Sequence, residues 1–179
     1  MSVLPIQQFP QPILKRPTVP VERIDARLRA LIDGLIKTMR HHPRCVGLAA
    51  PQIGSDARVA VMDASVHPKA THSRGLIVLI NPVLELDVER VVGREGCLSV
   101  PDFTANVRRA ARVTVRALDV SGVRQEFRLD GFEAIVAQHE IDHLNGKLFL
   151  DRVANVKTDV FRRKNYWLPD GSSERCEAG

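Results

Sequence analysis

The sequence lacks an apolar run of about 18 residues, the length from which a membrane-spanning helix is inferred. It also lacks internal repeats and low-complexity tracts. Residues 1–5 do not form a basic segment followed by an apolar one, which argues against a secretory signal. The three cysteines, Cys45, Cys97 and Cys176, are odd in number and irregularly spaced, so no disulfide framework is expected. We therefore expect neither a membrane partner nor an oxidising compartment.

What is present is a chain of 179 residues with 44% hydrophobic content, enough for one well-formed core. We expect a single domain over residues 1–169 and a disordered tail over residues 170–179. Residues 10–20 are Pro-rich and predicted to be extended, and residues 22–41 are predicted to form an amphipathic helix. Strands are predicted over residues 57–63, 76–80, 82–92, 111–119 and 123–129. This order predicts an α+β fold, with antiparallel strands packed around a later, central helix.

The predicted central helix carries the sequence His139-Glu140-Ile141-Asp142-His143. Two histidines four residues apart share one face of a helix, so both imidazoles can hold one divalent metal ion. Glu140, beside the first histidine, can act as general base toward water at such an ion. The chemistry indicated is metal-assisted hydrolysis of an amide or a similar carbonyl bond. The alternative is a chance occurrence of the pattern on an ordinary solvated helix.

The residues around this motif favour a helix over residues 131–145. Asp130 and Glu133 have the spacing of a capping box, which marks the start of a helix. Gly146 is a typical helix stop. The context therefore supports the functional interpretation of the two histidines.

A catalytic metal ion of the zinc type usually has three protein ligands and one open position. In one large class of metalloproteases the third ligand is a histidine at the position of Phe149, so that class is disfavoured. Another class uses a later glutamate, but Glu174 and Glu177 lie in the polar tail. Cys97 is the better candidate, because a thiolate is a strong ligand for zinc or ferrous iron. Taken alone, Cys97 would be interpreted as a small buried hydrophobic residue.

Three motifs cover Gly47–Gly54, Glu95–Ser99 and Gln138–Leu144. In this order they resemble the motifs of the peptide deformylases, and the resemblance extends over about residues 3–151. It implies a metal-dependent hydrolase that removes the formyl group from the N-terminal methionine of newly made polypeptides and releases formate. The implied partners are formyl-methionyl peptides and nascent chains, and no DNA partner is expected.

The resemblance also implies the metal site. Cys97, His139 and His143 would hold one divalent ion, with water as the fourth ligand. The native ion of the family is ferrous iron, which zinc, nickel or cobalt can replace. The donor set of one cysteine and two histidines itself suits several of these metals.

The catalytic roles are likewise implied by the resemblance. Glu140 would take a proton from water and later pass it to the leaving amine. The side-chain amide of Gln52 and the backbone N–H of Leu98 would stabilise the oxyanion that develops on the formyl group.

The methionine side chain of a substrate is expected near Val46, Gly47, Ile135 and Val136. For Ile135 and Val136, simple core packing is an equally good interpretation. The residue chemistry alone does not select a formyl group over an acetyl group or an internal peptide bond. Our hypothesis is that a small pocket, walled by Gly47 and the Cys97-Leu98 segment, admits only a one-carbon acyl group.

Further residues around the motifs carry weaker expectations. By analogy with the family, Glu95 is expected to pair with Arg109 and brace the Cys97 loop, although two separately solvated charges are the alternative. Asp142 either accepts a hydrogen bond behind the site or faces solvent. Cys45 replaces a glycine common in bacterial members of the family, which puts peptide selectivity in doubt. Thr104 stands where some members carry an arginine that contacts substrate, which predicts a weaker hold on the peptide beyond methionine.

Arg162-Arg163-Lys164 form a short basic run near the C-terminus. A solvated surface is the favoured interpretation, because patches that signal binding usually contain about five to eight residues. Transient contact with ribosomal RNA is the alternative, which a net charge of +5 permits.

The expected location is the bacterial cytoplasm, with a mature organellar enzyme as the alternative. Two other functions stay open at this point. One is a deformylase-like amidohydrolase with altered acyl or peptide preference, and the other is a catalytically silent metal-binding protein. Glu140 argues against the silent protein, because a structural metal site needs no general base.

Overall fold

The computed structural model describes residues 3–167 and 173–175. In chain order its helices, with η marking a 3-10 helix, are η1 (Pro12–Lys15), α1 (Ala26–His41), η2 (Ala50–Ile53), η3 (Ala64–Val66), α2 (Gly131–Leu144), η4 (Phe149–Arg152) and α3 (Val156–Asp159). Its strands are β1 (Gly47–Ala49), β2 (Val59–Met62), β3 (Ile77–Leu86), β4 (Arg90–Cys97), β5 (Val100–Ala110), β6 (Arg112–Leu118), β7 (Arg124–Asp130), β8 (Val160–Arg162), β9 (Asn165–Trp167) and β10 (Ser173–Arg175). No helix within the described residues is long and apolar enough to cross a membrane.

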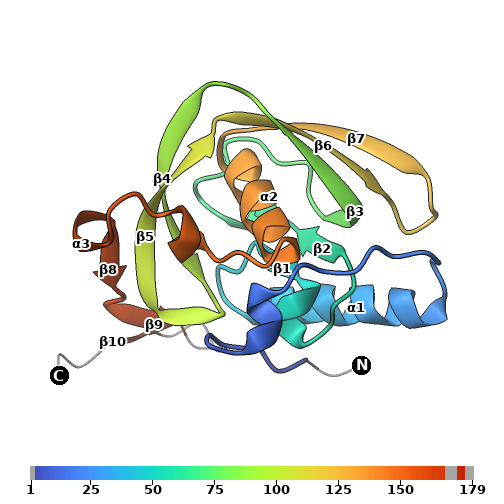
Figure 1. Cartoon of the computed structure of the whole chain (residues 1–179), viewed down its shortest axis with the longest axis horizontal. Helices are drawn as coiled ribbons and strands as arrows, with labels where there is room; N and C mark the ends of the chain where they lie inside the picture. The colour runs from blue at the N-terminus through green and yellow to red at the C-terminus, as the bar shows by residue number, and fades with distance from the viewer. Residues whose placement is uncertain (1–2, 168–172, 176–179) are drawn as a thin grey trace.

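The strands form a five-stranded sheet in the order β1-β2-β3-β6-β7 and a three-stranded sheet in the order β4-β5-β8. Within the described residues, strands β9 and β10 pair only with each other. All pairings between these strands are antiparallel, as the sequence predicts. Figure 1 shows α2 between the long strands of the two larger sheets and α1 along the outside. The predicted α+β fold around a central helix is confirmed.

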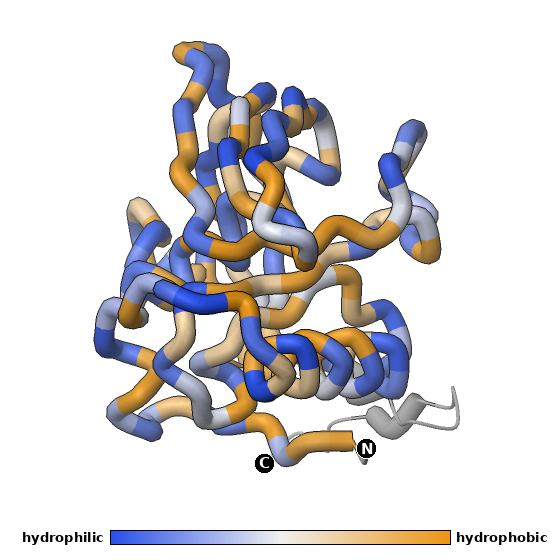
Figure 2. Tube along the Cα trace, turned by 90° about the vertical axis from the view of Figure 1, so that its right-hand side faces the viewer, coloured by the Kyte–Doolittle hydropathy of each residue, from blue (hydrophilic) through white to orange (hydrophobic). Residues whose placement is uncertain are grey.

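Helix α2 is the core of the molecule, and residues on every side of it are buried. Its apolar side chains pack with those of β3, β6 and β7 in one hydrophobic cluster. Figure 2 shows hydrophobic segments through the body of the chain and hydrophilic residues at many outer turns. Five polar residues of α2 are also buried, namely Glu133, Gln138, Glu140, Asp142 and His143. Because buried polar groups need partners, these five side chains must be satisfied inside the fold or by a bound group.

Helix α1 begins at Ala26, four residues later than the sequence pattern predicts. The Asp25 carboxylate accepts a hydrogen bond from the backbone N–H of Leu28 at 2.9 Å and caps the helix. Just before it, Asn81 bonds both backbone groups of Val21, at 2.8 and 2.7 Å. These contacts hold the chain extended up to the cap, which the apolar periodicity does not reveal. The segment 10–20 is also not fully extended, because it contains η1.

The predicted strand over residues 82–92 is wrong. Strand β3 continues to Leu86, the chain turns at residues 87–89, and β4 begins at Arg90. Asp87 forms this turn, because its carboxylate accepts from the N–H of Val88 and its carbonyl accepts from the Arg90 side chain at 2.7 Å. The long strand β5, which pairs with β4, was not predicted at all.

Helix α2 occupies residues 131–144, within one residue of its prediction, but the predicted capping box is absent. Asp130 makes no side-chain cap, and Glu133 instead accepts from Ser73 Oγ at 2.9 Å and from the Arg74 N–H at 2.8 Å. The loop before β3 therefore donates hydrogen bonds to the carboxylate that a capping box would place at the start of the helix.

Gly146 ends the helix as predicted, with φ at +69°. A Cβ there would lie 2.8 Å from the backbone carbon of Arg16. Glycine is required here for the left-handed conformation and for the close approach of the N-terminal segment.

The predicted disordered tail over residues 170–179 falls largely outside the described residues. Within it, Ser173–Arg175 form β10 and pair with β9. The boundary of the predicted domain at residue 169 also lies outside the described residues.

Candidate metal centre

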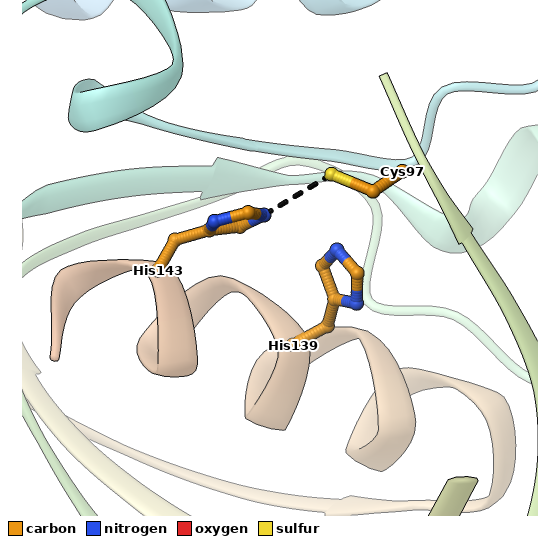
Figure 3. Close-up of side chains that lie close together, drawn as sticks. All are labelled: Cys97, His139 and His143. Carbon is orange, nitrogen blue, oxygen red and sulfur yellow. Dashed lines mark hydrogen bonds between the residues drawn. The ribbon is translucent and has the colours of Figure 1, made fainter. Parts of the chain in front are cut away.

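Cys97, His139 and His143 come together at the centre of the molecule, as the sequence predicts. Their candidate ligand atoms all lie within 4.8 Å of one another. Figure 3 shows the two imidazoles rising from successive turns of α2 toward the sulfur at the end of β4. His143 Nε2 lies 3.3 Å from Cys97 Sγ. Segments 46 residues apart in the sequence therefore supply one donor cluster.

The position of Cys97 depends on the tight connection between β4 and β5. The pairing register shifts after Gly96, so that Cys97 stands opposite Val100 and the chain turns over only two residues. The N–H of Ser99 points at Cys97 Sγ at 3.4 Å. The Ser99 carbonyl in turn accepts from the Phe9 N–H at 2.9 Å. The N-terminal segment thus holds the turn that presents the sulfur.

These residues fit a divalent metal ion. A tetrahedral ion with bonds of about 2.3 Å to sulfur and 2.0–2.1 Å to nitrogen spans donor atoms about 3.5 Å apart, close to the 3.3 Å between Cys97 Sγ and His143 Nε2. Burial disfavours a charge on Cys97, but the neighbouring His143 and His139 rings outweigh it and hold the thiol pKa well below its usual value. The thiolate is the form that binds metals. Three donors also leave one position open, as in catalytic rather than structural sites.

Glu95 fixes the orientation of His139. The Nδ1 atom of His139 lies 2.8 Å from Glu95 Oε2, so this nitrogen donates to the carboxylate and Nε2 is left to face the sulfur. Burial disfavours a charge on Glu95, but its hydrogen bonds with Arg109 and His139 outweigh burial and lower its pKa to about 2. Glu95 is therefore a carboxylate at neutral pH.

Arg109 connects strand β4, which carries Cys97, with helix α2, which carries the two histidines. Its guanidinium bonds both carboxylate oxygens of Glu95, at 2.7 and 3.0 Å, which confirms the predicted pair. It also donates to Asp142 Oδ2 at 2.5 Å, and Arg152 donates to Asp142 at 2.5 and 3.0 Å. Asp142 is thus a buried acceptor and does not face solvent. The network joins β4 and β5 to α2 directly behind the two histidines.

Gln138 forms a second link between β5 and α2, and no role was predicted for it from the sequence. Its amide accepts from the N–H of Ala110 and donates to the carbonyl of Ala110, both at 2.9 Å. This pair of bonds ties the end of β5 to α2 one residue before His139. The only available signal was its place at the head of the third motif.

Glu140 lies against the backbone of Gly47. A Cβ at position 47 would be 2.4 Å from Glu140 Oε1, so only glycine leaves room for the carboxylate. Glu140 is 3% exposed, and its Oε2 has no hydrogen-bond partner within the described part of the chain. Burial raises the pKa of Glu140 to about 7, although the charges of His139 and His143 act in the opposite direction. Such a carboxyl group can both accept and return a proton near neutral pH.

Gln52 lies in η2 with its side chain directed into the cluster. Its Oε1 accepts from the Ala49 N–H at 2.9 Å, which orients the amide. Its Nε2 then points at Cys97 Sγ, 3.3 Å away, and at Ser99 Oγ, 3.2 Å away. A fixed N–H donor therefore stands beside the sulfur. Leu98, in the turn after Cys97, lines the same space.

A cleft of about 430 Å³ opens onto the cluster. The four residues predicted to contact a methionine side chain all line it, namely Val46, Gly47, Ile135 and Val136. Val136 also packs in the main core, so both interpretations of this residue hold. Cys45 and Thr104 line the cleft as well. Burial raises the pKa of the Cys45 thiol, and Glu140 raises it further, so Cys45 is neutral.

The comparison with known families gives one result over most of the chain. Residues 3–159 match the family model for polypeptide deformylase. A peptide deformylase of Desulfosudis oleivorans is 44% identical over 165 residues, which cover 92% of this chain and 93% of the relative. A peptide deformylase of Bartonella tribocorum is 40% identical over 164 residues, covering 92% of each chain.

Solved structures agree with the sequence comparison. The crystal structure of a peptide deformylase from Thermotoga maritima has a TM-score of 0.79 and 38% identity, covering 87% of this chain and all of the other. A class I type b peptide deformylase from Acinetobacter baumannii, with Met-Ala-Ser bound, has a TM-score of 0.79 and 37% identity. That comparison covers 85% of this chain and 99% of the other.

Replacement of Arg109 by methionine is expected to lower the free energy of unfolding by about 3–5 kcal/mol, because two buried carboxylates lose their shared cation. The matched control is Arg112→Met, which removes an arginine whose ion pairs with Asp87 and Glu89 lie at the exposed surface. The control should change stability little. Urea unfolding of both variants with the same metal content measures the difference, and equal effects would contradict the bracing role of Arg109.

Proposed function

This chain belongs to the polypeptide deformylase family and removes the formyl group from the N-terminal methionine of new polypeptides, and we propose that Glu140 moves the proton in this reaction. The single observation that carries the proposal is the placement of Glu140. Its carboxylate is buried in the wall of the cleft beside the cluster of Cys97, His139 and His143. A carboxyl group in this position can contact both the attacking water and the substrate.

We propose that Cys97, His139 and His143 hold one ferrous ion, the metal implied by the family resemblance. The donor set supports a divalent ion of this kind, although it suits zinc as well. When bound there, such an ion supplies Lewis-acid polarisation of the formyl carbonyl and activation of water. Glu95 keeps the His139 ring in position for it, through the 2.8 Å contact at Nδ1.

Glu140 performs the proton transfers. As a carboxylate it takes a proton from the attacking water while the new C–O bond forms. It then returns this proton to the nitrogen of methionine as the C–N bond breaks, so that formate and a free amine leave. Its pKa of about 7 suits both steps. The bare backbone of Gly47 leaves room for the carboxylate in this position.

Gln52 and Leu98 stabilise the negative charge that develops on the formyl oxygen. The Gln52 amide is already oriented by the Ala49 N–H, so little reorganisation is needed when its donor turns to the oxygen. The backbone N–H of Leu98 supplies the second donor, from the turn that follows Cys97. Val46, Gly47, Ile135 and Val136 enclose the methionine side chain.

The Glu140→Gln variant tests the role of Glu140. We expect it to keep its metal and to release formate from formyl-Met-Ala-Ser about 10²–10⁴-fold more slowly, because a general acid–base group contributes this much. Elemental analysis gives the metal content and a formate assay gives the rate. Glu126→Gln, on the exposed surface of β7, is the control with the same change of charge.

The substrate side of the proposal is tested with acetyl-Met-Ala-Ser, which the wild-type enzyme should not hydrolyse at a comparable rate. A metal-loaded Glu140→Gln variant that works at the wild-type rate would contradict the proton role. Wild-type enzyme that is metal-loaded and inactive on the formyl peptide would contradict the function itself.

The identity of the metal has its own test. Protein purified without oxygen is expected to contain about one iron per chain, and its activity should decay faster in aerated buffer than in anaerobic buffer with a reductant. Ferrous iron and the Cys97 thiolate are both sensitive to oxidation, whereas zinc has no redox chemistry. Zinc as the purified metal, with equal stability in both buffers, would contradict the proposal.

We also propose that the protein acts in the bacterial cytoplasm, with an organelle as the alternative, and touches the ribosome transiently. Arg162 and Lys164 are exposed, which supports attraction to RNA phosphates. On cell fractionation the chain should appear in the cytoplasm and sediment partly with ribosomes at low salt. The double variant Arg162→Glu with Lys164→Glu should lose this co-sedimentation, and unchanged sedimentation would contradict the contact.

A further inference from the structure

The middle residue of the basic run, Arg163, does not share the exposed position of its neighbours. Strand β8 pairs with β5, with Phe161 opposite Thr104 and Arg162 opposite Phe103. Directly after the strand, the N–H of Arg163 donates to the carbonyl of Asp102 at 2.7 Å. Figure 1 shows β8 lying alongside β5 at the left of the molecule. The backbone of Arg163 is therefore anchored to the sheet that carries Cys97.

The side chain of Arg163 extends from there into the substrate cleft, which it lines. It passes over Gly96, where an added Cβ would lie 2.6 Å from Arg163 Nη2 and 3.5 Å from Cζ. The absence of a side chain at Gly96 is what admits the guanidinium. Gly96 immediately precedes Cys97, so the charge stands next to the metal cluster without belonging to it.

One donor of Arg163 is buried without a partner. Its Nε has no hydrogen bond to any residue in the described part of the chain. A buried N–H that lacks an acceptor is costly, so the Arg163 side chain gains a hydrogen bond when it turns toward an acceptor that a ligand brings into the cleft. The guanidinium, with five N–H donors, can bind carbonyl oxygens at its edge.

The neighbouring arginine is held differently. The Cζ of Arg94 lies 3.6 Å from the centre of the Phe161 ring, and its Nη1 donates to Thr104 Oγ1 at 3.3 Å. Arg94 is thus stacked and bonded within the protein. Of the two arginines at this wall, Arg163 is the one with the buried unused donor.

We propose that Arg163 is a peptide-positioning residue that binds a backbone carbonyl of the substrate beyond the formyl-methionine. The proposal rests on the proposed function. With the formyl group at the Cys97 cluster and the methionine side chain among Val46, Ile135 and Val136, the rest of the peptide must leave along another wall. The wall formed by Arg94, Thr104 and Arg163 is polar. A formylated N-terminus carries no charge, and backbone carbonyls are the acceptors present in every nascent chain.

The test compares two substrates in the metal-loaded enzyme. Formyl-Met-Ala-Ser has carbonyls beyond methionine, and formyl-methionine amide does not. Arg163→Ala should lower kcat/KM for the tripeptide about 10-fold or more, mainly through a higher KM. The kcat/KM for formyl-methionine amide should stay within about 2-fold of the wild-type value, since only the tripeptide loses a charge-assisted hydrogen bond. Arg163→Lys should recover part of this loss, because it keeps the charge without the planar fork.

Arg162→Ala is the matched control, because it removes the same charge from the adjacent, exposed position. It should leave both substrates unchanged. Equal loss on both substrates in Arg163→Ala would show a structural role and overturn the inference, as would no loss on either. If Arg162→Ala lowered kcat/KM for the tripeptide as much as Arg163→Ala does, the cause would be general charge attraction, and the inference would also be overturned. Failure of the wild-type enzyme on both substrates would instead contradict the proposed function.

Discussion

A buried guanidinium, that of Arg109, holds the candidate metal centre together. It sits on β5 and pairs with Glu95 on β4 and with Asp142 on α2. Glu95 orients His139, and Asp142 immediately precedes His143. The strand that carries the thiolate and the helix that carries the imidazoles are thereby fixed to each other. Buried carboxylates without this cation would destabilise the fold strongly, so the stability of the core and the geometry of the site depend on the same charges.

Close backbone approach is the second constraint on the site. Gly47 leaves space for the Glu140 carboxylate, and Gly96 leaves space for the Arg163 guanidinium. In each case a charged group lies against a bare backbone, where one methyl group would displace it. The same cleft is therefore lined by the carboxyl group of Glu140 and by the guanidinium of Arg163. This arrangement suits a substrate with a reacting carbonyl at one end and an extended backbone leading away from it.

The C-terminal segment changes the interpretation of the short basic run. From the sequence, Thr104 predicts a weaker hold on the peptide, and a solvated surface is the favoured interpretation of residues 162–164, with ribosomal RNA contact as the alternative. Arg94 donates to Thr104 and Arg163 lines the same cleft, whereas Arg162 and Lys164 are exposed. Pairing of β8 with β5 decides which of three adjacent cations enters the cleft. The basic run therefore consists of two exposed residues, Arg162 and Lys164, and one residue of the cleft wall, Arg163.

The sequence by itself determined the central helix and the residues that gather as candidate metal donors, because spacing along one helix and the chemistry of the donors are local properties. The pairing of Glu95 with Arg109 was expected only by analogy with the family. The sequence also predicted the α+β class and most strands, but it missed β5, merged β3 with β4, and assigned Glu133 to a cap. Only the tertiary structure placed Arg109 between two carboxylates and gave Gln138 its partner. It alone placed Arg163 over Gly96, since those contacts join segments far apart in the chain. Local patterns specify what an element is, whereas packing between elements decides which buried charges meet.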